Sequence, residues 1–428
     1  MAGSTSVQDM VRPADCVDLY YYDGATSMKQ CFATTQNTKY QQAFQTLGAG
    51  QVVFTIPPQN GIQDVVLNMG ILVPATNNCN LIQGWGYALI DQVSFRYGGS
   101  SQFFISGQQL LQNALRKQPS RSTANDLMNL GGSYTLGSSG GTSAQECSVV
   151  LTLPHNSVPS GVGKPHPLPT DALTQQCQIT VILKNPATAC FWGASASSAP
   201  SSLTFGNFVV QQVMLNNQGD ALSRRVNMAD NAYAFGCEFV QQQQTIALQS
   251  SSSSQSVVLT GFRSGEVKAI HIWLTDTDDT PSGNATNDPF IWYLPKAIEM
   301  LYAGEKFAVF TNGGGTGGGS LAQLYNLLNG NKAPAVDVTS TGNAANGYGT
   351  GSVSAGTTTL SKWVELPFAQ TFVDEDAHYM LVHGKPITNG IVNLNITTPT
   401  AASTWQLNVS YIYNSTLLFS QGTCDYVF

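Results

Sequence analysis

Apolar and polar residues alternate with a period of two along most of the chain. In "TWQLNVSYIYN" at 404–414, every second residue from Trp405 to Tyr413 is apolar or aromatic, and the residues between them are polar apart from Ile412. "IVNLNITT" at 391–398 and "CQITVILK" at 177–184 alternate in the same way. Because successive side chains of a strand point to opposite faces, these runs predict strands with one buried face. Gly, Pro, Asn and Ser clusters separate them, which favours antiparallel sandwiches or barrels.

Helical periodicity is confined to a few short segments. "GQQLLQNALRK" at 107–117, "SLAQLYNLLNG" at 320–330 and "DALSRRVNMADNAYAF" at 220–235 predict helices. The one compact basic segment, "LRKQPSRS", holds Arg116, Lys117 and Arg121. We interpret it as a helix end followed by a loop, because cations suit a helix C-terminus.

The two halves of the chain repeat the same order of short patterns. "QVVFT" at 51–55 matches "SVVLT" at 256–260, and the turn at 97–99 matches the turn at 302–304, both with an offset of 205. Four more strings find counterparts in the same order: those at 63–73, 148–154, 176–186 and 205–217 match 265–275, 362–367, 390–399 and 403–415. Six matches in register predict an internal duplication of one β unit of about two hundred residues.

Each β unit has about eight strands and a helix after the fourth, which is the pattern of a jelly roll. The predicted fold class is therefore all-β, with two tandem eight-stranded antiparallel jelly rolls and short flanking helices. The expected organisation is an N-terminal arm (1–31), a first jelly roll (32–217), a connector (218–235) and a second jelly roll (236–428).

Charge is sparse on this chain. Of 428 residues, 42% are hydrophobic and only 10% are charged, against about 25% in typical soluble domains. Gln, Asn, Ser, Thr and Gly supply the polarity instead, and such a neutral, hydrogen-bonding surface suits a protein packed among copies of itself. The net charge of −7 argues against a large nucleic-acid footprint, so no sequence-specific nucleic-acid partner is expected.

The N-terminal sequence "MAGSTSVQDMVRPADC" lacks the apolar core of a signal peptide, and no apolar run approaches the ~18 residues of a membrane span. We expect the chain to be made and assembled in a reducing compartment. No cysteine belongs to a CxxC pair, so neither zinc nor redox chemistry is predicted. Buried free thiols are expected at Cys16, Cys31, Cys79, Cys147, Cys177, Cys190, Cys237 and Cys424.

Two clusters raise the question of a metal. The loop "TDTDDTPSGNATND" places Asp276, Asp278 and Asp279 together, as a calcium loop does, but no Glu closes the loop and a plain acidic turn is the alternative. His378 and His383 flank a segment that follows "DED" at 374–376, and there a charged surface loop is the alternative. We predict no resident metal, no cofactor and no catalytic residue.

Two surface features are candidates for modification or contact. Asn284 is the one N-x-S/T sequon in a plausible loop, whereas Asn395, Asn408 and Asn414 fall within alternating strands and are interpreted as coincidence. "DLYYYDG" places Tyr20, Tyr21 and Tyr22 in a polar segment. Because interfaces are enriched in Tyr, they are candidate interface anchors, with packing inside the chain as the alternative.

"VSFRYGGSSQFFISGQQLLQNAL" at 93–115, the terminal "WQLNVSYIYNSTLLFSQGTCDYVF" and the duplication together resemble the double jelly-roll major capsid proteins of icosahedral double-stranded DNA viruses, including the nucleocytoplasmic large DNA viruses. The resemblance covers nearly the whole chain. It implies a homotrimer whose six similar barrels form a pseudo-hexagonal capsomer, located in the virion. It also implies contacts with neighbouring capsomers and minor capsid proteins, and it allows an internal membrane beneath the shell.

Other functions remain as alternatives. The chain could be a minor or vertex capsid component, or a glycan-binding spike. A paired-jelly-roll enzyme is the third alternative: a glycan amidase could use "DED" at a cleft, whereas a copper monooxygenase would need an HxH pattern that this sequence lacks. The expected role is structural, not enzymatic.

Overall fold

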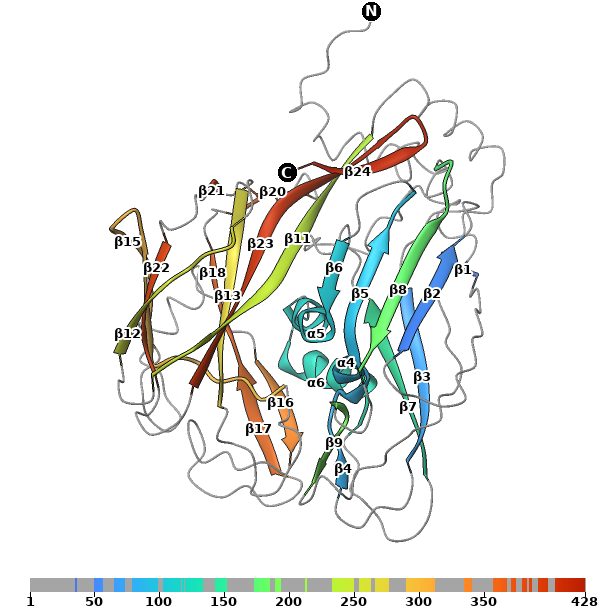
Figure 1. The fold of residues 1–428 in the computed structure, drawn as a ribbon, viewed down its shortest axis with the longest axis horizontal. Helices are drawn as coiled ribbons and strands as arrows, with labels where there is room; N and C mark the ends of the chain where they lie inside the picture. The colour runs from blue at the N-terminus through green and yellow to red at the C-terminus, as the bar shows by residue number, and fades with distance from the viewer. Residues whose placement is uncertain are drawn as a thin grey trace, which may run out of the picture.

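The computed structural model contains two β-barrels, one formed by the strands β1 to β10 and the other by β11 to β24 (Figure 1). The first barrel lies at the right of the view and the second at the left, with the helices α4, α5 and α6 in the middle. The structure describes residues 35–36, 50–56, 65–73, 79–98, 103–116, 118, 120–133, 143–151, 173–184, 189–193, 212–213, 233–249, 254–262, 266–276, 290–311, 335–340, 357–367, 371–374, 379–382, 385–386, 392–398 and 405–427.

The first barrel has a four-stranded sheet in the order β2-β8-β5-β6, together with the antiparallel pairs β3-β7, β1-β10 and β4-β9. Its strands are β1 (Thr35–Gln36), β2 (Gly50–Ile56), β3 (Val65–Val73), β4 (Cys79–Leu81), β5 (Ile90–Arg96), β6 (Phe103–Ser106), β7 (Ser143–Leu151), β8 (Cys177–Leu183), β9 (Phe191–Gly193) and β10 (Gln212–Val213).

The second barrel has two larger sheets, ordered β11-β23-β13-β18 (with β21 and β24 at its margins) and β12-β22-β14-β15, and the pairs β16-β17 and β19-β20. Its strands are β11 (Tyr233–Ala247), β12 (Ser254–Val258), β13 (Glu266–Asp276), β14 (Ala297–Tyr302), β15 (Glu305–Thr311), β16 (Ala335–Ser340), β17 (Thr357–Lys362), β18 (Val364–Pro367), β19 (Thr371–Asp374), β20 (Tyr379–Val382), β21 (Lys385–Pro386), β22 (Val392–Thr397), β23 (Trp405–Ser420) and β24 (Thr423–Val427).

The duplication is visible in the strand order. The strands β2, β8, β5 and β6 of the first barrel correspond in sequence order to β12, β22, β14 and β15 of the second, and each set forms one sheet with the same order. The matched turns also agree in backbone, because Gly98 and Ala303 have φ of 59° and 52°. The predicted all-β class with two tandem units is confirmed, whereas the count of eight strands per unit and the exact domain boundaries stay predictions.

The alternating runs bury the faces that the sequence predicted. In β23 the residues from Trp405 to Tyr413 at every second position are at most 2% exposed, and β8 buries Ile179, Val181 and Leu183 in the same way. The buried apolar residues of both barrels form one continuous cluster. The two barrels are therefore joined through packed side chains as well as through the connecting chain.

The helices α4 (Trp85–Leu89), α5 (Gly107–Arg116) and α6 (Arg121–Leu130) all belong to the first barrel. The helix predicted at 107–117 is confirmed as α5. Arg121 was assigned to a loop, but it is the first residue of α6, because Ser120 forms a capping box with Thr123 and starts a new helix there. The predicted helix at 320–330 lies outside the described residues.

The third predicted helix, at 220–235, is wrong at its C-terminal end. Tyr233, Ala234 and Phe235 form the start of β11 and pair with Phe419, Leu418 and Leu417 of β23. These residues form a strand because they pair with the long strand β23, and this pairing satisfies the hydrogen-bonding groups of their backbone.

Candidate assembly interface between the two barrels

The helix α5 is held by contacts at its first turn. Ser106 Oγ accepts a hydrogen bond from the Gln109 backbone N–H at 3.2 Å, and Gln109 Oε1 accepts one from the Ser106 N–H at 3.1 Å. This reciprocal pair is a capping box, which the sequence Ser-Gly-Gln-Gln encodes. Gly107 lies so close to the preceding segment that a Cβ there would sit 2.1 Å from the Tyr87 carbonyl oxygen. The helix can therefore start at this point only with glycine.

One face of α5 is polar although it is buried. Gln109 and Gln112 are 1% exposed and Asn113 is 4% exposed, while the Arg116 side chain is 7% exposed. The spacing of three, four and seven residues from Gln109 puts these side chains on the same face of the helix. Figure 1 shows that α5 lies beside the β11-β23-β13-β18 sheet of the second barrel. The polar face of α5 and the side of this sheet next to it form the inter-barrel interface.

The sheet offers polar partners to this helix. Gln109 Nε2 donates a hydrogen bond to Ser410 Oγ on β23 at 3.0 Å, and the contact is buried. Arg116 Nε lies 3.9 Å from Glu365 Oε2 on β18. His271 on β13 places its Nε2 3.3 Å from the same Glu365 oxygen. A carboxylate of the second barrel is thus shared between its own histidine and an arginine of the first.

The hydrogen bonds continue along the same side of the sheet. Asn408, which is 2% exposed, donates from Nδ2 to Thr275 Oγ1 at 3.0 Å and accepts from Thr245 Oγ1 at 3.1 Å. These bonds fix three neighbouring strands relative to one another. They also leave no room for a glycan on Asn408, in line with the interpretation of this sequon as coincidence.

The Gln112 side chain, on the same face of α5, is unsatisfied at both of its polar atoms. Both its amide nitrogen and its amide oxygen are buried, and neither has a hydrogen-bond partner among the described residues. A buried polar group without a partner costs about 1–3 kcal/mol. The side chain therefore weakens the interface instead of stabilising it.

Replacing Gln112 by leucine is expected to raise the free energy of unfolding by about 1 kcal/mol, because it removes the unpaired amide and keeps the volume. The matched control is Gln109→Leu on the same helix face, which loses the bond to Ser410 and the side-chain half of the capping box and should lower stability by about 1–2 kcal/mol. Thermal unfolding of both variants checks the prediction. A Gln112→Leu protein that melts below the wild type contradicts it.

Aromatic residues make the apolar part of the interface. Phe290 is 0% exposed and packs edge-to-face against Trp292, with ring centroids 6.1 Å apart. Trp292 packs edge-to-face against Trp363 at 5.1 Å. The Phe290 ring reaches the first barrel at Gly84, where a Cβ would lie 3.3 Å from it. A chain of rings from the second barrel thus ends against α4 and its N-terminal turn.

The C-terminal hairpin forms a third contact between the barrels. β23 and β24 are joined by Gln421 and Gly422, both with positive φ (49° and 77°), as a two-residue turn of the mirror-image type requires. The Gly422 carbonyl accepts hydrogen bonds from the Thr174 backbone N–H at 2.9 Å and from Thr174 Oγ1 at 3.1 Å. In Figure 1 this hairpin reaches from the second barrel across the top toward the first.

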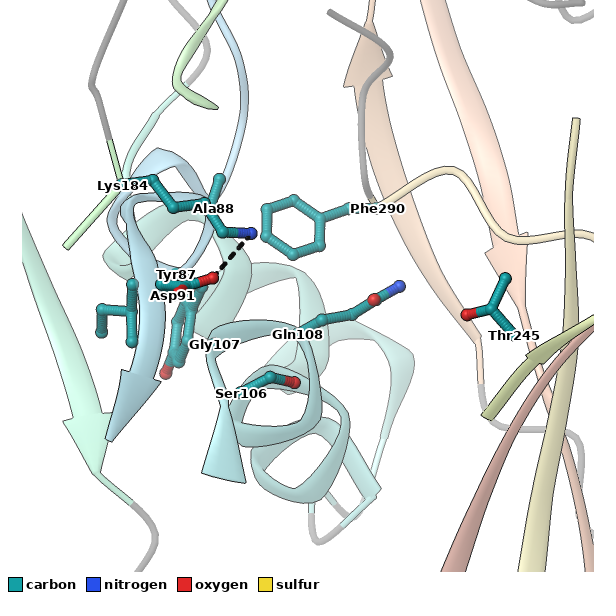
Figure 2. A pocket seen from close by; sticks show the side chains of 10 residues that line it. Tyr87, Ala88, Asp91, Ser106, Gly107, Gln108, Lys184, Thr245 and Phe290 are labelled. Carbon is teal, nitrogen blue, oxygen red and sulfur yellow. Dashed lines mark ion pairs between the residues drawn. The ribbon is translucent and has the colours of Figure 1, made fainter. Parts of the chain in front are cut away.

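A pocket of about 290 Å³ opens at the border of the interface (Figure 2). Asp91, Gln108 and Lys184 line it from the first barrel, and Thr245 and Phe290 from the second. Lys184 Nζ lies 3.8 Å from Asp91 Oδ1, and in Figure 2 the ammonium group also points toward the Phe290 ring. Both charged side chains are about half exposed, so this ion pair contributes little. The residues described as lining the pocket offer neither a nucleophile beside a base nor a set of metal ligands.

Most candidate metal, glycosylation and interface residues predicted from the sequence lie outside the described residues. Asp276 ends β13, but its side chain is not described, and Asp278 and Asp279 lie outside the described residues, as do Asn284 and Tyr20, Tyr21 and Tyr22. His378 and His383 also lie outside them. Within the described part of the chain, no three His, Cys, Asp or Glu side chains gather as a metal site would require. His271 on β13 is the one histidine among the described residues, and it lies in the interface.

The described thiols are buried and chemically quiet. Cys147, Cys177, Cys190 and Cys424 are free and buried, as predicted for them. Burial raises the pKa of the Cys177 thiol to about 12, and it raises the pKa values of the Cys147 and Cys190 thiols as well. Since the thiolate is the reactive form, these groups are poor nucleophiles at neutral pH. No helix in the described ranges is long and apolar enough to cross a membrane.

Comparisons with known proteins place the fold. No family model and no curated protein sequence matches the chain. Among solved structures, PBCV-1 VP54, fitted into a cryo-EM reconstruction of the virophage Sputnik, has a TM-score of 0.57 at 12% identity and covers 93% of this chain and 99% of its own. A chain of the quasi-atomic model of the PBCV-1 virus capsid has a TM-score of 0.55 at 13% identity, with the same coverage of both chains.

These matches span both barrels in one alignment. With the duplicated sheet order and the flanking helices, they define the class: the chain has the double jelly-roll fold. At 12–13% identity the likeness concerns the fold. It transfers no individual site residue.

Proposed function

We propose that this chain is a major capsid protein, a structural subunit whose homotrimers form pseudo-hexagonal capsomers in the shell of an icosahedral virus. Its place is then the virion. Its partners are neighbouring capsomers and minor capsid proteins, with an internal membrane beneath the shell as a further candidate. The role is structural and requires neither a cofactor nor catalysis.

The observation that carries the proposal is the inter-barrel interface. Buried contacts from Gln109 to Ser410 and from Arg116 to Glu365, together with the Phe290 aromatic chain, join two similar barrels into one block. A shell subunit needs this rigidity, because it holds its neighbours at fixed angles. Three such blocks present six similar barrels, which can occupy a six-fold position in a lattice. The fold shared with VP54 and the sparse surface charge support the same role.

The remaining sequence predictions take their place within this proposal. The units 32–217 and 236–428 are the two barrels of the block. The arm at 1–31, with Tyr20, Tyr21 and Tyr22, serves contacts beneath the shell or with neighbouring subunits. Because Tyr is enriched at interfaces, these three residues are the first to test by alanine substitution.

Light scattering on the purified full-length protein tests the proposal. The chain has a mass of 45.6 kDa, so a trimer has three times that mass. We expect the trimer mass to persist on dilution, because obligate interfaces commonly bury more than ~2,000 Å². A protein that stays monomeric at every concentration overturns the capsomer assignment. The pocket beside Lys184 and Asp91 would then be tested for glycan binding and hydrolysis.

A further inference from the structure

His271 lies beneath the middle of α5. On its sheet it is the central residue of one row across three strands, opposite Ser410 on β23 and opposite Glu365 on β18. At one end of the row, Gln109 of α5 binds Ser410. At the other end, Arg116 of α5 approaches Glu365. These helix positions are about 10 Å apart along the axis, and two strand spacings also span about 10 Å. The polar face of α5 therefore follows the row and covers His271, which is 1% exposed.

Two groups from different barrels approach one oxygen of Glu365. His271 Nε2 lies 3.3 Å from Glu365 Oε2, and Arg116 Nε lies 3.9 Å from the same oxygen. The histidine belongs to the same sheet as the carboxylate, whereas the arginine comes from the first barrel. All three side chains are at most 13% exposed, so their charges are screened far less than they would be in water. Both neighbours therefore respond to a change in the charge of His271.

The charge of this cluster is balanced while His271 is neutral. Arginine stays protonated at physiological pH, and the carboxylate of Glu365 compensates the charge of Arg116 across the interface. Protonating His271 adds a second cation beside Glu365 Oε2. The imidazolium forms a charge-assisted hydrogen bond with the carboxylate and repels the guanidinium. Glu365 is then held by its own sheet, and Arg116 loses the counter-charge that keeps it at the interface.

The surrounding groups do not offset the added charge. Among the described side chains of α5, β13, β18 and β23, the charged ones beside His271 are Arg116, Glu365 and Lys268. Lys268 lies in the bulge of β13 and has the same sign as an imidazolium. β23 places the uncharged Ser410 opposite the histidine, and its tyrosines alternate onto the other face. A protonated His271 therefore leaves the closed interface with more positive than negative charge.

Opening of the interface relieves this excess, because water then solvates both cations. The contact between Arg116 and Glu365 thus contributes to stability while His271 is neutral, and its contribution is lost as the pH falls. Histidine ordinarily changes its charge between about pH 8 and about pH 5. We propose that His271 is a pH-sensitive switch of the inter-barrel interface: its protonation draws Glu365 onto the sheet of the second barrel, releases Arg116 and loosens α5 from that sheet in mild acid.

The switch is local and lies within one chain. The aromatic contacts of Phe290 and the backbone bonds of the C-terminal hairpin carry no charge that titrates in this range, so they keep the barrels joined. The inference goes beyond the proposed function, and it holds whether or not the chain forms trimers.

Hydrogen exchange of the full-length protein, followed by mass spectrometry, tests the proposal. Exchange is measured at about pH 8 and about pH 5.5 and corrected for the pH dependence of the intrinsic rate. The segment of interest is α5, and β8 in the first barrel is the internal reference. In the wild type, the α5 amides are expected to exchange about tenfold faster at the lower pH, the effect of losing one buried charged contact, while β8 stays unchanged.

Two variants assign the response to the cluster. In His271→Gln the side chain can still donate a hydrogen bond to Glu365 but takes up no proton, so α5 should exchange equally at both pH values. Arg116→Gln has no guanidinium to release, so its α5 should exchange at the fast rate already at the higher pH. His166→Gln, the same substitution elsewhere in the sequence, is the matched control and should respond as the wild type does.

A wild-type α5 that exchanges equally fast or more slowly in mild acid overturns the proposal. An α5 that keeps the full wild-type response in His271→Gln or in Arg116→Gln also overturns it, because another group then titrates. Either variant is decisive alone, so the test survives if one of them fails to fold. If β8 accelerates as much as α5, acid unfolds the barrel as a whole and the local switch is refuted.

Discussion

Replacing Gly107 by alanine is expected to lower the free energy of unfolding by about 3 kcal/mol, one of the largest effects of any single methyl group in this chain. The added Cβ would lie 2.1 Å from the Tyr87 carbonyl oxygen and 2.6 Å from the Ile90 carbonyl oxygen. Both obstacles are backbone atoms, so no side-chain rotation relieves the contact. The start of α5 has to move, and the inter-barrel interface moves with it.

Chemical denaturation followed by tryptophan fluorescence measures this change. Gly304→Ala is the control, because nothing lies within 4 Å of its new Cβ and only the positive φ of 84° opposes it. That backbone conformation should cost about 1 kcal/mol. If both variants lose the same small amount of stability, the close approach at Gly107 is not what positions α5.

The sequence predicted the barrels well because their pattern is local. Every second residue of β23 is apolar, and a strand turns those residues into one buried face whatever its partners are. The duplication predicted from the offset of 205 is likewise confirmed by the matching strand orders β2-β8-β5-β6 and β12-β22-β14-β15. The capping box of α5 is encoded in four consecutive residues and could be recognised without knowing the rest of the fold.

The interface could not be predicted in this way. Asn408 and Ser410 lie on the face of β23 that the alternation marks as polar and solvent-facing, yet both are at most 2% exposed. Ser410 is buried beside α5, which lies some three hundred residues earlier in the chain, and Gln109 supplies the hydrogen bond that water would have made to Ser410. Asn408 finds its partners in Thr245 and Thr275 on the neighbouring strands. One signal was present: α5 is amphipathic, but its polar face carries glutamine and asparagine where a solvated helix usually carries charge.

Replacing Phe290 by alanine is expected to lower the free energy of unfolding by about 3–5 kcal/mol and to loosen the coupling between the barrels. Phe290 is fully buried, and its ring connects Trp292 in the second barrel to the turn before α4 in the first. Without it, the hydrogen bond from Gln109 to Ser410 and the contact between Arg116 and Glu365 become the main support. Polar contacts of this kind give specificity more than strength.

Calorimetry distinguishes coupling from simple loss of stability. The wild type should melt in one transition, because one continuous apolar cluster spans both barrels, whereas Phe290→Ala should separate into two transitions, one for each barrel. Phe104→Ala is the matched control, since the same substitution at a side chain that is 44% exposed should shift stability by less than about 1 kcal/mol and keep one transition. A single, strongly lowered transition in Phe290→Ala would show that the barrels stay coupled without this ring, and would assign the coupling to the polar face of α5 and the C-terminal hairpin instead.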